Sequence, residues 1–337
     1  MQKIKLAVLG AGHLGKIHIK CALAAEQIEL VGFFDLDEKN SQTVIEQFGL
    51  HRFSSYEELL DSVDAVDIVT PTPAHFEAAK QAMEAGKHVF VEKPVTATIA
   101  EGEALLELQK KHPVKVQVGH VERFNPAFTA LKDMPLAPMF IEGHRLAAFQ
   151  PRGTEVAVVL DLMIHDLDLV LRLIDSPVKA VSASGVAVMS DTPDIANARI
   201  EFENGAVANL TASRISLKQM RKMRLFQPDA YISLDFFEKN AQIVRLYAQD
   251  AENLPPQDQL MEFDTKLGKK WMQLQMPETQ AVNAIQRELE TFADSILEDT
   301  EPVVSLKDGF RALRLAQAIL DEIEERRQSA TLPHLNI

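Results

Sequence analysis

Three short motifs in the sequence carry groups that could do chemistry. The first, Gly10-Ala11-Gly12-His13-Leu14-Gly15, has glycines at the spacing of a phosphate-binding turn. The second, Glu92-Lys93-Pro94, places an amine directly after an apolar run. The third is the pair Asp161 and His165, four residues apart and therefore on one face of a helix. Together these groups could bind a dinucleotide, stabilise charge on an oxygen and move a proton.

The glycine motif has the sequence context that dinucleotide binding requires. It follows a strand-like run at Ile4–Leu9 and opens a helical pattern near Leu14–Ala25. The first glycine permits a tight turn, the second lets a pyrophosphate approach the backbone, and the third allows close helix–strand packing. The helix N-terminus offers free N–H groups and a favourable dipole to phosphates. We therefore predict cofactor binding by Gly10, Gly12, His13, Leu14 and Gly15.

Asp35 is the expected partner of the glycine motif. It ends the second strand-like run, 20 residues beyond Gly15, where a carboxylate accepts hydrogen bonds from an adenosine ribose diol. A carboxylate there repels a 2′-phosphate, which favours NAD over NADP as the cofactor. Asp37 is an alternative reader of the ribose, or a helix cap.

Two more strand ends are expected at the cofactor crevice, because ligands of open α/β sheets bind beyond the carboxyl ends of the strands. The first reads Thr-Pro-Thr-Pro-Ala-His from residue 70, which also fits a turn that leads into a helix, and the second is the Glu-Lys-Pro motif. The residues predicted to contact the cofactor here are Thr70, Pro71, Thr72, His75, Glu92 and Lys93.

Polar residues form a stripe on the apolar helix expected at 159–174. Asp161, His165, Asp168 and Arg172 follow one another at spacings of 4, 3 and 4. An ion pair between Asp168 and Arg172 would explain the second half of the stripe. Burying Asp161 and His165 is costly unless they have a use, which makes them functional candidates. The sequence supplies neither cysteine ligands nor a HExxH pattern beside this pair, so no metal site is expected.

The first 120 residues alternate strand-like and helical patterns, which predicts a doubly wound parallel sheet of the Rossmann type. The expected strands are Ile4–Leu9, Ile28–Phe34, Ala65–Val69, His88–Val91 and Val114–Val118. We assign residues 1–120 to this NAD-binding domain.

The pattern changes after Gly119, and we predict that residues 121–337 form an α+β domain with an open, mixed, largely antiparallel sheet. Hairpin turns are expected at Asn204-Gly205 and Lys239-Asn240. Two helices, at 280–297 and 306–327, close the chain, and the last could pack back on the first domain. The tail from residue 328 is expected to be extended.

Composition narrows the class of protein. The 337 residues carry a formal net charge of −14, which argues against binding nucleic acid or an anionic membrane surface. The sequence has no apolar run long enough to span a membrane. A single cysteine, Cys21, is typical of a reducing compartment, so a cytoplasmic location is expected.

The glycine motif, the Glu-Lys-Pro motif and the Asp161/His165 helix together resemble the glucose–fructose oxidoreductase / inositol dehydrogenase (Gfo/Idh/MocA) family. The resemblance implies a homodimer or homotetramer assembled through the second domain's sheet, and catalytic roles for Lys93, Asp161 and His165. A sugar hydroxyl would lose its proton to His165 while its carbon gives a hydride to nicotinamide. Lys93 would donate a hydrogen bond to that oxygen, and Asp161 would orient Lys93 or hold a neighbouring hydroxyl. Whether His165 or Lys93 takes the proton stays open.

Two segments bear on the substrate. The sequence of residues 119–126, which includes Arg123 and Asn125, resembles that of the family branch that oxidises C3 of UDP-N-acetylglucosamine. Both residues could instead cap the next helix. The segment 214–224 holds five basic residues and no acidic one, so it could bind a diphosphate, form a solvated surface or contact another subunit. The residues predicted to bind substrate are Arg123, Asn125, Arg145 and Arg221.

The sequence thus predicts an NAD-dependent dehydrogenase of a sugar or nucleotide sugar. Two alternatives stay open: a dehydrogenase of a free polyol or aldose, and a non-enzymatic protein that senses a dinucleotide on the same fold.

Overall fold

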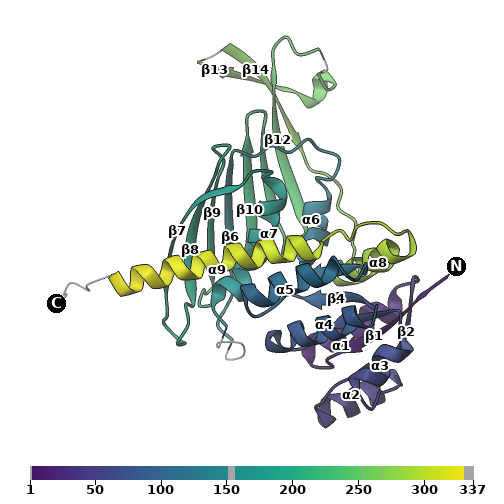
Figure 1. The fold of residues 1–337 in the computed structure, drawn as a ribbon. Helices are drawn as coiled ribbons and strands as arrows, with labels where there is room; N and C mark the ends of the chain where they lie inside the picture. Colours follow the sequence, from purple (N-terminus) through teal and green to yellow (C-terminus); the bar gives the residue numbers. More distant parts are fainter. Residues whose placement is uncertain (1, 151–155, 253, 267, 330–337) are drawn as a thin grey trace. The chain divides into compact units, whose positions relative to one another are not determined.

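The computed structural model describes residues 2–150, 156–252, 254–266 and 268–329 (Figure 1). The chain divides into two compact units. The first comprises Met1–Phe124 and Val282–Arg314, and the second comprises Asn125–Ala281 and Leu315–Ile337.

In the first unit, the described residues form five parallel strands in the order β2-β1-β3-β4-β5. The strands are β1 (Ile4–Leu9), β2 (Ile28–Phe34), β3 (Ala65–Ile68), β4 (His88–Glu92) and β5 (Val116–Gly119). Four of them, β1, β3, β4 and β5, are buried over nearly their whole length, as a sheet covered on both faces requires. The predicted doubly wound sheet is confirmed, and the strand order reverses between β1 and β3, where such folds bind ligands.

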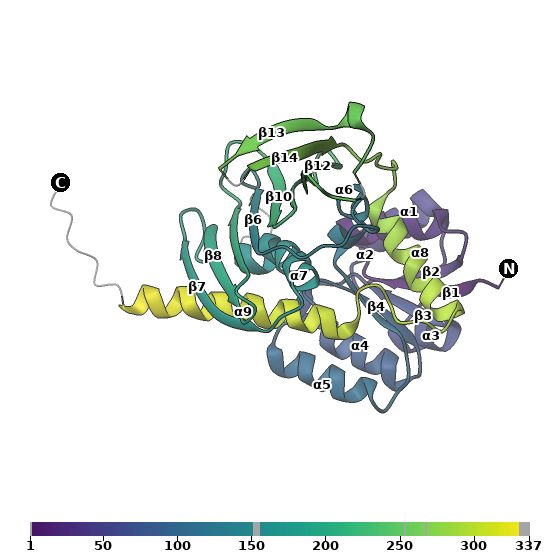
Figure 2. The same cartoon turned by 90° about the horizontal axis from the view of Figure 1, so that it is seen from above.

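Helices cover both faces of this sheet. Helices α1 (His13–Ala24) and α8 (Ala284–Leu297) pack together on one face, while α4 (His75–Glu84) and α5 (Ile99–Gln109) pack together on the other (Figure 2). The shorter α2 (Glu38–Phe48) and α3 (Tyr56–Ser62) connect β2 to β3. Side chains cap several of these helices: Thr98 and Glu101, for example, form a reciprocal capping box at the start of α5.

Residues 282–314 belong to the first unit, which differs from the expected division of the chain at residue 120. Leu289 and Phe292 of α8 share a hydrophobic core with Ile4 and Phe90 of the parallel sheet. The last helix, α9 (Leu306–Ser329), begins in the first unit and continues into the second. The sequence shows the helices but not the face against which they pack.

The described residues of the second unit form a mixed sheet of nine strands. Its order is β13-β14-β12-β11-β10-β6-β9-β8-β7, antiparallel throughout except for the parallel pair β6/β9. The strands are β6 (Phe140–Leu146), β7 (Val178–Val186), β8 (Ile195–Phe202), β9 (Val207–Ser213), β10 (Met220–Gln227), β11 (Ala230–Asp235), β12 (Asn240–Ala248), β13 (Met261–Thr265) and β14 (Gly268–Gln275).

Both expected hairpins are present, and their turns contain left-handed residues, Gly205 with φ 85° and Lys239 with φ 55°. The hairpin β13/β14, which extends beyond the other strands in Figure 1, was not expected. Its first strand is only five residues long and almost entirely exposed, so its apolar–polar alternation does not correspond to a buried face.

A helix packs on one face of this mixed sheet and carries the Asp161/His165 pair. It begins as a π-helical segment, Val159–Met163, and continues as α7 (Ile164–Leu173) against β6 and β9. The expected helix at 159–174 is confirmed, but its π-helical first turn was not expected. Alternate residues of β9 and β11 are buried, which leaves the other face of the sheet more open.

The extended tail expected from residue 328 falls mostly outside the described residues, since α9 runs to Ser329 and residues 330–337 are not described. None of the described helices is long and apolar enough to cross a bilayer.

Asp194 holds the β7–β8 connection in the second unit. Its Oδ2 accepts hydrogen bonds from the backbone N–H groups of Val188, Met189 and Ser190 at 2.8, 2.6 and 3.1 Å. The Ser190 hydroxyl donates to Oδ1 at 2.8 Å, and Arg214 Nε lies 3.5 Å away. Burial opposes ionisation of Asp194, but these donors outweigh it and lower its pKa to about 2.

We expect Asp194→Asn to lower the free energy of unfolding by about 1–3 kcal/mol at neutral pH, because charge-assisted hydrogen bonds are lost. The folded-state pKa is depressed, so this contribution is present above the usual value of 3.8 and is lost as the pH falls towards about 2. Urea unfolding between neutral pH and the acid limit measures both effects. Equal stability of wild type and variant at neutral pH would contradict the role given to Asp194.

Candidate functional site

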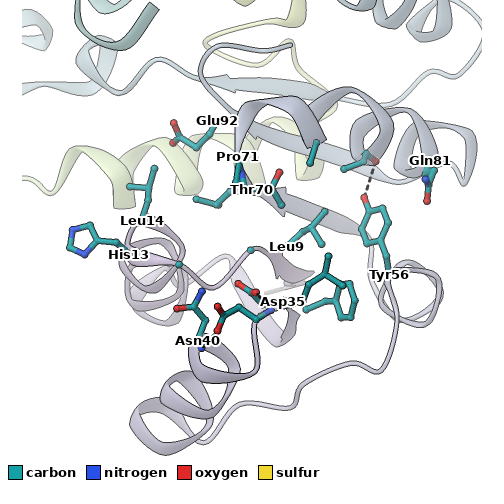
Figure 3. Close-up of a pocket in the computed structure, with 18 of the residues that line it drawn as sticks. Leu9, His13, Leu14, Asp35, Asn40, Tyr56, Thr70, Pro71, Gln81 and Glu92 are labelled. Carbon is teal, nitrogen blue, oxygen red and sulfur yellow. Dashed lines mark hydrogen bonds between the residues drawn. The ribbon is translucent and has the colours of Figure 1, made fainter. Parts of the chain in front are cut away.

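A cavity of about 770 Å³ lies in the first unit, beyond the carboxyl ends of β1, β2, β3 and β4. Figure 3 shows Asp35 and Asn40 on one side of it, and Thr70, Pro71 and Glu92 on another. Its lining includes Leu9, Gly10, Gly12, His13, Leu14, Phe34, Asp35, Leu36, Asp37, Asn40, Tyr56, Val69, Thr70, Pro71, Ala74, Ala78, Gln81, Glu92 and Lys93. The cavity thus brings together the glycine motif, the ribose-reading carboxylate and the Glu-Lys-Pro motif.

The glycine motif forms the tight turn between β1 and α1. Gly10 has φ +101°, and a Cβ there would lie 2.7 Å from the carbonyl oxygen of Val69. A Cβ at Gly15 would collide with the carbonyl oxygen of Gly10, so α1 approaches the turn more closely than a side chain allows. At Gly12 a Cβ would meet no described atom within 4 Å, which leaves open space at the helix N-terminus. Gly15 is buried and contributes through packing, while Gly10 and Gly12 line the cavity.

Asp35 and Asp37 have different roles in the structure. Asp35 Oδ2 accepts a hydrogen bond from the backbone N–H of Ala11 at 2.5 Å, and its Oδ1 accepts one from Asp37 N–H at 2.7 Å. The Asp35 carboxylate is therefore fixed against the glycine turn. Asp37 caps α2 by accepting from the backbone N–H of Asn40 at 2.9 Å. Both residues line the cavity, and the cap explains why Asp37 follows β2.

The segment after β3 contributes to the cavity unevenly. Thr70 and Pro71 line it, and Thr70 Oγ1 is buried without a hydrogen-bond partner among the described residues. Thr72 begins a short 3₁₀ turn. His75 lies behind the wall, with Nε2 2.8 Å from Thr70 O and Nδ1 2.9 Å from Pro94 O. Burial lowers the pKa of His75, although both carbonyls favour the charged ring.

Glu92, Lys93 and Pro94 end β4 at the cavity. Glu92 is buried, and its Oε2 accepts a hydrogen bond from the Lys93 backbone N–H at 3.1 Å. The Lys93–Pro94 peptide is cis. Lys93 is half-buried and lines the cavity with Glu92.

The cavity fits a dinucleotide. The open space at Gly12 would accept a pyrophosphate, and the first N–H groups of α1 would donate to it. The Asp35 carboxylate would accept hydrogen bonds from a ribose diol, and Thr70 Oγ1 needs a partner that a ligand could supply. Lys93 is a polar group at the β4 end of the same cavity.

In the second unit, Asp161 lies in the π-helical segment and His165 in the first turn of α7, both half-buried. π-Helical turns occur often at functional sites. The expected polar stripe does not continue along the helix, because Asp168 is 1% exposed whereas Arg172 is exposed to solvent.

The Arg145 side chain is held inside the second unit. Its Nε and Nη2 donate to Asp166 Oδ2 and Oδ1 at 3.1 and 2.7 Å, a bidentate ion pair buried between β6 and α7. The guanidinium also lies 6.0 Å from the ring centre of Phe236. Asp166 therefore neutralises the Arg145 guanidinium, which was expected to face the substrate. Substrate binding by Arg145 stays a prediction.

Arg123 and Asn125 are both buried. Arg123 Nη2 lies 3.9 Å from Asp308 Oδ1 in the first unit. Asn125 caps the short helix α6 (Pro126–Thr129), as the alternative interpretation proposed, and its Nδ2 donates to Phe236 O at 3.0 Å.

Three basic residues of segment 214–224 lie beside acidic neighbours, as the alternative of a strand paired with acidic residues proposed. Arg214 is buried beside Asp194 and donates to Val156 O. Lys222 pairs with Asp235 at 3.0 Å, and Arg224 pairs with Glu142 at 2.7 Å. Successive side chains of β10 point to opposite faces, so the exposed Arg221 lies on the other face, beside Arg145 in the β6/β10 register.

Comparison with known proteins places these features in one family. The family described as "Oxidoreductase family, NAD-binding Rossmann fold" matches residues 4–120, and the GFO/IDH/MocA C-terminal domain matches residues 142–229. The chain belongs to the Gfo/Idh/MocA family. The expected resemblance is therefore confirmed, and the chain is an oxidoreductase whose cofactor is NAD.

Individual Gfo/Idh/MocA relatives are similar over most of the chain. UDP-N-acetylglucosamine 3-dehydrogenase of Acidithiobacillus ferrooxidans is 39% identical over 256 residues, which cover 76% of this chain and 81% of that protein. A solved structure of that enzyme superposes with a TM-score of 0.86 at 34% identity, covering 96% of this chain and 99% of the other. The NAD(+)-dependent scyllo-inositol 2-dehydrogenase of Bacillus subtilis is 33% identical over 64% of this chain and 68% of that protein.

Several residues of this family member's cavity were missed from the sequence. Tyr56 and Gln81 come from α3 and α4, and Tyr56 donates a hydrogen bond to Ala78 O at 2.9 Å (Figure 3). Neither residue belongs to a motif. His18, which contacts Glu92 but does not itself line the cavity, was also missed, although a polar residue between Ile17 and Ile19 was a usable signal. No group of three or more potential metal ligands was found among the described residues.

We expect Asp35→Ala to weaken NADH binding at least about tenfold (~1.4 kcal/mol). The variant loses the acceptor for the ribose diol and leaves the Ala11 N–H without its carboxylate partner. Titration calorimetry measures the dissociation constant. Asp37→Asn is the matched control, because asparagine keeps the α2 cap. Weaker NADH binding by Asp37→Asn but not by Asp35→Ala would assign the ribose to Asp37 instead.

Proposed function

We propose that this chain oxidises a secondary hydroxyl of a nucleotide sugar, UDP-N-acetylglucosamine at C3, with NAD as the oxidant. The observation that carries the oxidation is Lys93 on the wall of the cavity that Gly10, Gly12 and Asp35 also line. The choice of substrate is supported by the similarity to UDP-N-acetylglucosamine 3-dehydrogenase, which extends over both units.

The chain's own residues would divide the chemistry as follows. NAD, when bound, supplies the acceptor for a hydride from the sugar carbon. The Lys93 ammonium donates a hydrogen bond to the reacting oxygen and stabilises its developing negative charge. His165 takes the hydroxyl proton, a task for which an imidazole suits near-neutral pH. Asp161, one turn before His165, holds a neighbouring hydroxyl.

For the diphosphate of the substrate we propose Arg221, which is exposed on β10 and whose guanidinium can bind two phosphate oxygens. Arg123, Asn125 and Arg145 are buried, whereas Arg221 is exposed, so they are weaker candidates. Assembly as a homodimer or homotetramer through the mixed sheet and a cytoplasmic location also stay predictions.

Purified protein should reduce NAD when UDP-N-acetylglucosamine is added, and a coupled aminotransferase that consumes the 3-keto sugar should increase the yield. The nicotinamide absorbance follows the reaction. Free N-acetylglucosamine should react at least about tenfold more slowly in kcat/KM, because the diphosphate contacts are absent. Turnover of free inositol or glucose without turnover of the nucleotide sugar would support the polyol alternative. NADH binding without reduction by any of these compounds would support a dinucleotide sensor.

Lys93→Met and His165→Asn should each lower kcat by about 10²–10³-fold, because each removes a group that acts on the reacting hydroxyl. Their NADH dissociation constants should stay within about threefold of wild type, since cofactor binding rests mainly on the glycine turn and Asp35. Lys110→Ala, a charge removal at the exposed end of α5, is the control and should leave kcat unchanged. A His165→Asn variant that retains kcat would move the proton to another group, with Lys93 the next candidate.

A further inference from the structure

A fully buried histidine, His18, lies directly beneath the Glu-Lys-Pro motif. It is on α1, in the first unit, and it contacts carboxylates from two strands. Its Nδ1 lies 2.9 Å from Asp67 Oδ2 on β3, and its Nε2 lies 3.2 Å from Glu92 Oε1 on β4. The His18 and Phe90 rings pack edge to face, with 5.7 Å between their centres. His18 does not line the cavity itself.

These contacts form a continuous series of side chains that ends at the Lys93 backbone. Glu92 presents Oε1 to His18 and Oε2 to the backbone N–H of Lys93, at 3.1 Å. The space for this carboxylate exists because β5 has a glycine opposite it: a Cβ on Gly119 would lie 2.7 Å from Glu92 Oε1. The order of contacts is therefore Asp67, His18, Glu92 and the Lys93 amide.

The charges on His18 and Glu92 strengthen this series of contacts at neutral pH. Burial alone would lower the pKa of His18, but the carboxylates of Asp67 and Glu92 outweigh burial and raise it well above 6.5. Burial would raise the pKa of Glu92, but the contacts with His18 and Lys93 outweigh it and lower that pKa. Burial raises the pKa of Asp67. The contact between His18 and Glu92 is thus a buried imidazolium–carboxylate pair.

A buried ion pair of this kind needs a reason beyond stability. Replacing such pairs by apolar residues is often neutral or stabilising, because both charges lose their hydration. Breaking one partner is costly because the other charge is left buried and unpaired. The carboxylate that His18 holds is adjacent in sequence to Lys93 and shares the cavity wall with it. A buried charge beside a reacting group is commonly there to orient it.

We propose that His18 is a positioning residue: by holding Glu92, it fixes the Lys93 backbone and so the place that the Lys93 ammonium occupies in the cavity. The inference rests on the proposed role of Lys93 in hydroxyl oxidation. The contact that matters is the one from His18 Nε2 to Glu92, whereas the contact from Nδ1 to Asp67 holds the ring in place.

Two substitutions separate these contacts. The side-chain amide of glutamine can place a donor near the position of Nε2, and that of asparagine can place one near the position of Nδ1. His18→Gln can therefore place a donor beside Glu92, where Nε2 makes an ion pair at 3.2 Å, and His18→Asn keeps the hydrogen bond to Asp67. A merely structural histidine predicts similar effects of both. The matched control is His88→Asn at the opposite end of β4, where the asparagine oxygen can still accept from the Lys115 N–H.

The first measurement is amide hydrogen exchange of the peptide that contains Lys93, which needs no substrate. We expect exchange of the Lys93 N–H to be about tenfold faster in His18→Asn than in wild type, and within about threefold in His18→Gln. Exchange there should not change in His88→Asn. Equal exchange in the two His18 variants would overturn the inference, whether or not the wild type oxidises a nucleotide sugar.

The second measurement is steady-state kinetics with NAD and UDP-N-acetylglucosamine. His18→Asn should lose about 100-fold in kcat, because a misplacement of about 1 Å can cost this much, whereas His18→Gln should stay within about fivefold of wild type. The KM for NAD and the melting temperature should change to a similar extent in both. A kcat that falls in parallel with melting temperature in both variants would show a structural role only and overturn the inference.

The two proposals fail in different ways. If the wild type is inactive but Lys93 N–H exchange is faster in His18→Asn than in His18→Gln, the nucleotide-sugar function is refuted. The inference that His18 fixes the Lys93 backbone then still stands. An active wild type whose His18→Asn variant keeps full kcat despite faster exchange would retain the function and refute the positioning role.

Discussion

All strands of a parallel sheet end at the same edge, and the functional groups of the first unit depend on that constraint. Gly10, Asp35, Thr70 and Lys93 follow four different strands, yet they line one cavity because those strands share a direction. The constraint is tight at the first strand, where α1 approaches so closely that a Cβ on Gly15 would collide with the Gly10 carbonyl. A bulkier residue there would push away the helix N-terminus that is to bind phosphates.

Buried charge organises the interior beneath this edge. His18 has no solvent contact, and without carboxylates its imidazolium would be very costly. Asp67 and Glu92 remove that cost, and Glu92 links the buried pair to the Lys93 backbone. The second unit also contains a buried ion pair, Arg145/Asp166, which joins β6 to the helix that carries Asp161 and His165. In both units a buried ion pair lies next to a candidate catalytic residue in sequence.

Much of the first unit could be predicted because local patterns decide it. The strand and helix periodicities, the glycine spacing and the position of Asp35 are all properties of neighbouring residues. Interpretations that depended on a face or a partner were less successful. For segment 214–224 the sequence left open a diphosphate site, a solvated surface or a subunit contact, and the structure shows that strand alternation and the acidic residues Glu142, Asp194 and Asp235 divide its charges. The hairpin β13/β14 was missed although Met261–Thr265 alternates apolar and polar residues, because this run is short and does not bury its apolar side chains.

The sequence by itself determined the fold class, the cofactor and the family, because each depends on residue types at short, regular spacings. The tertiary structure decided which of Asp35 and Asp37 is fixed against the glycine turn, that residues 282–314 complete the first unit, and that His18 contacts Glu92. Those outcomes depend on contacts between residues far apart in the chain. For them, packing and the need to pair buried charges matter more than local preference.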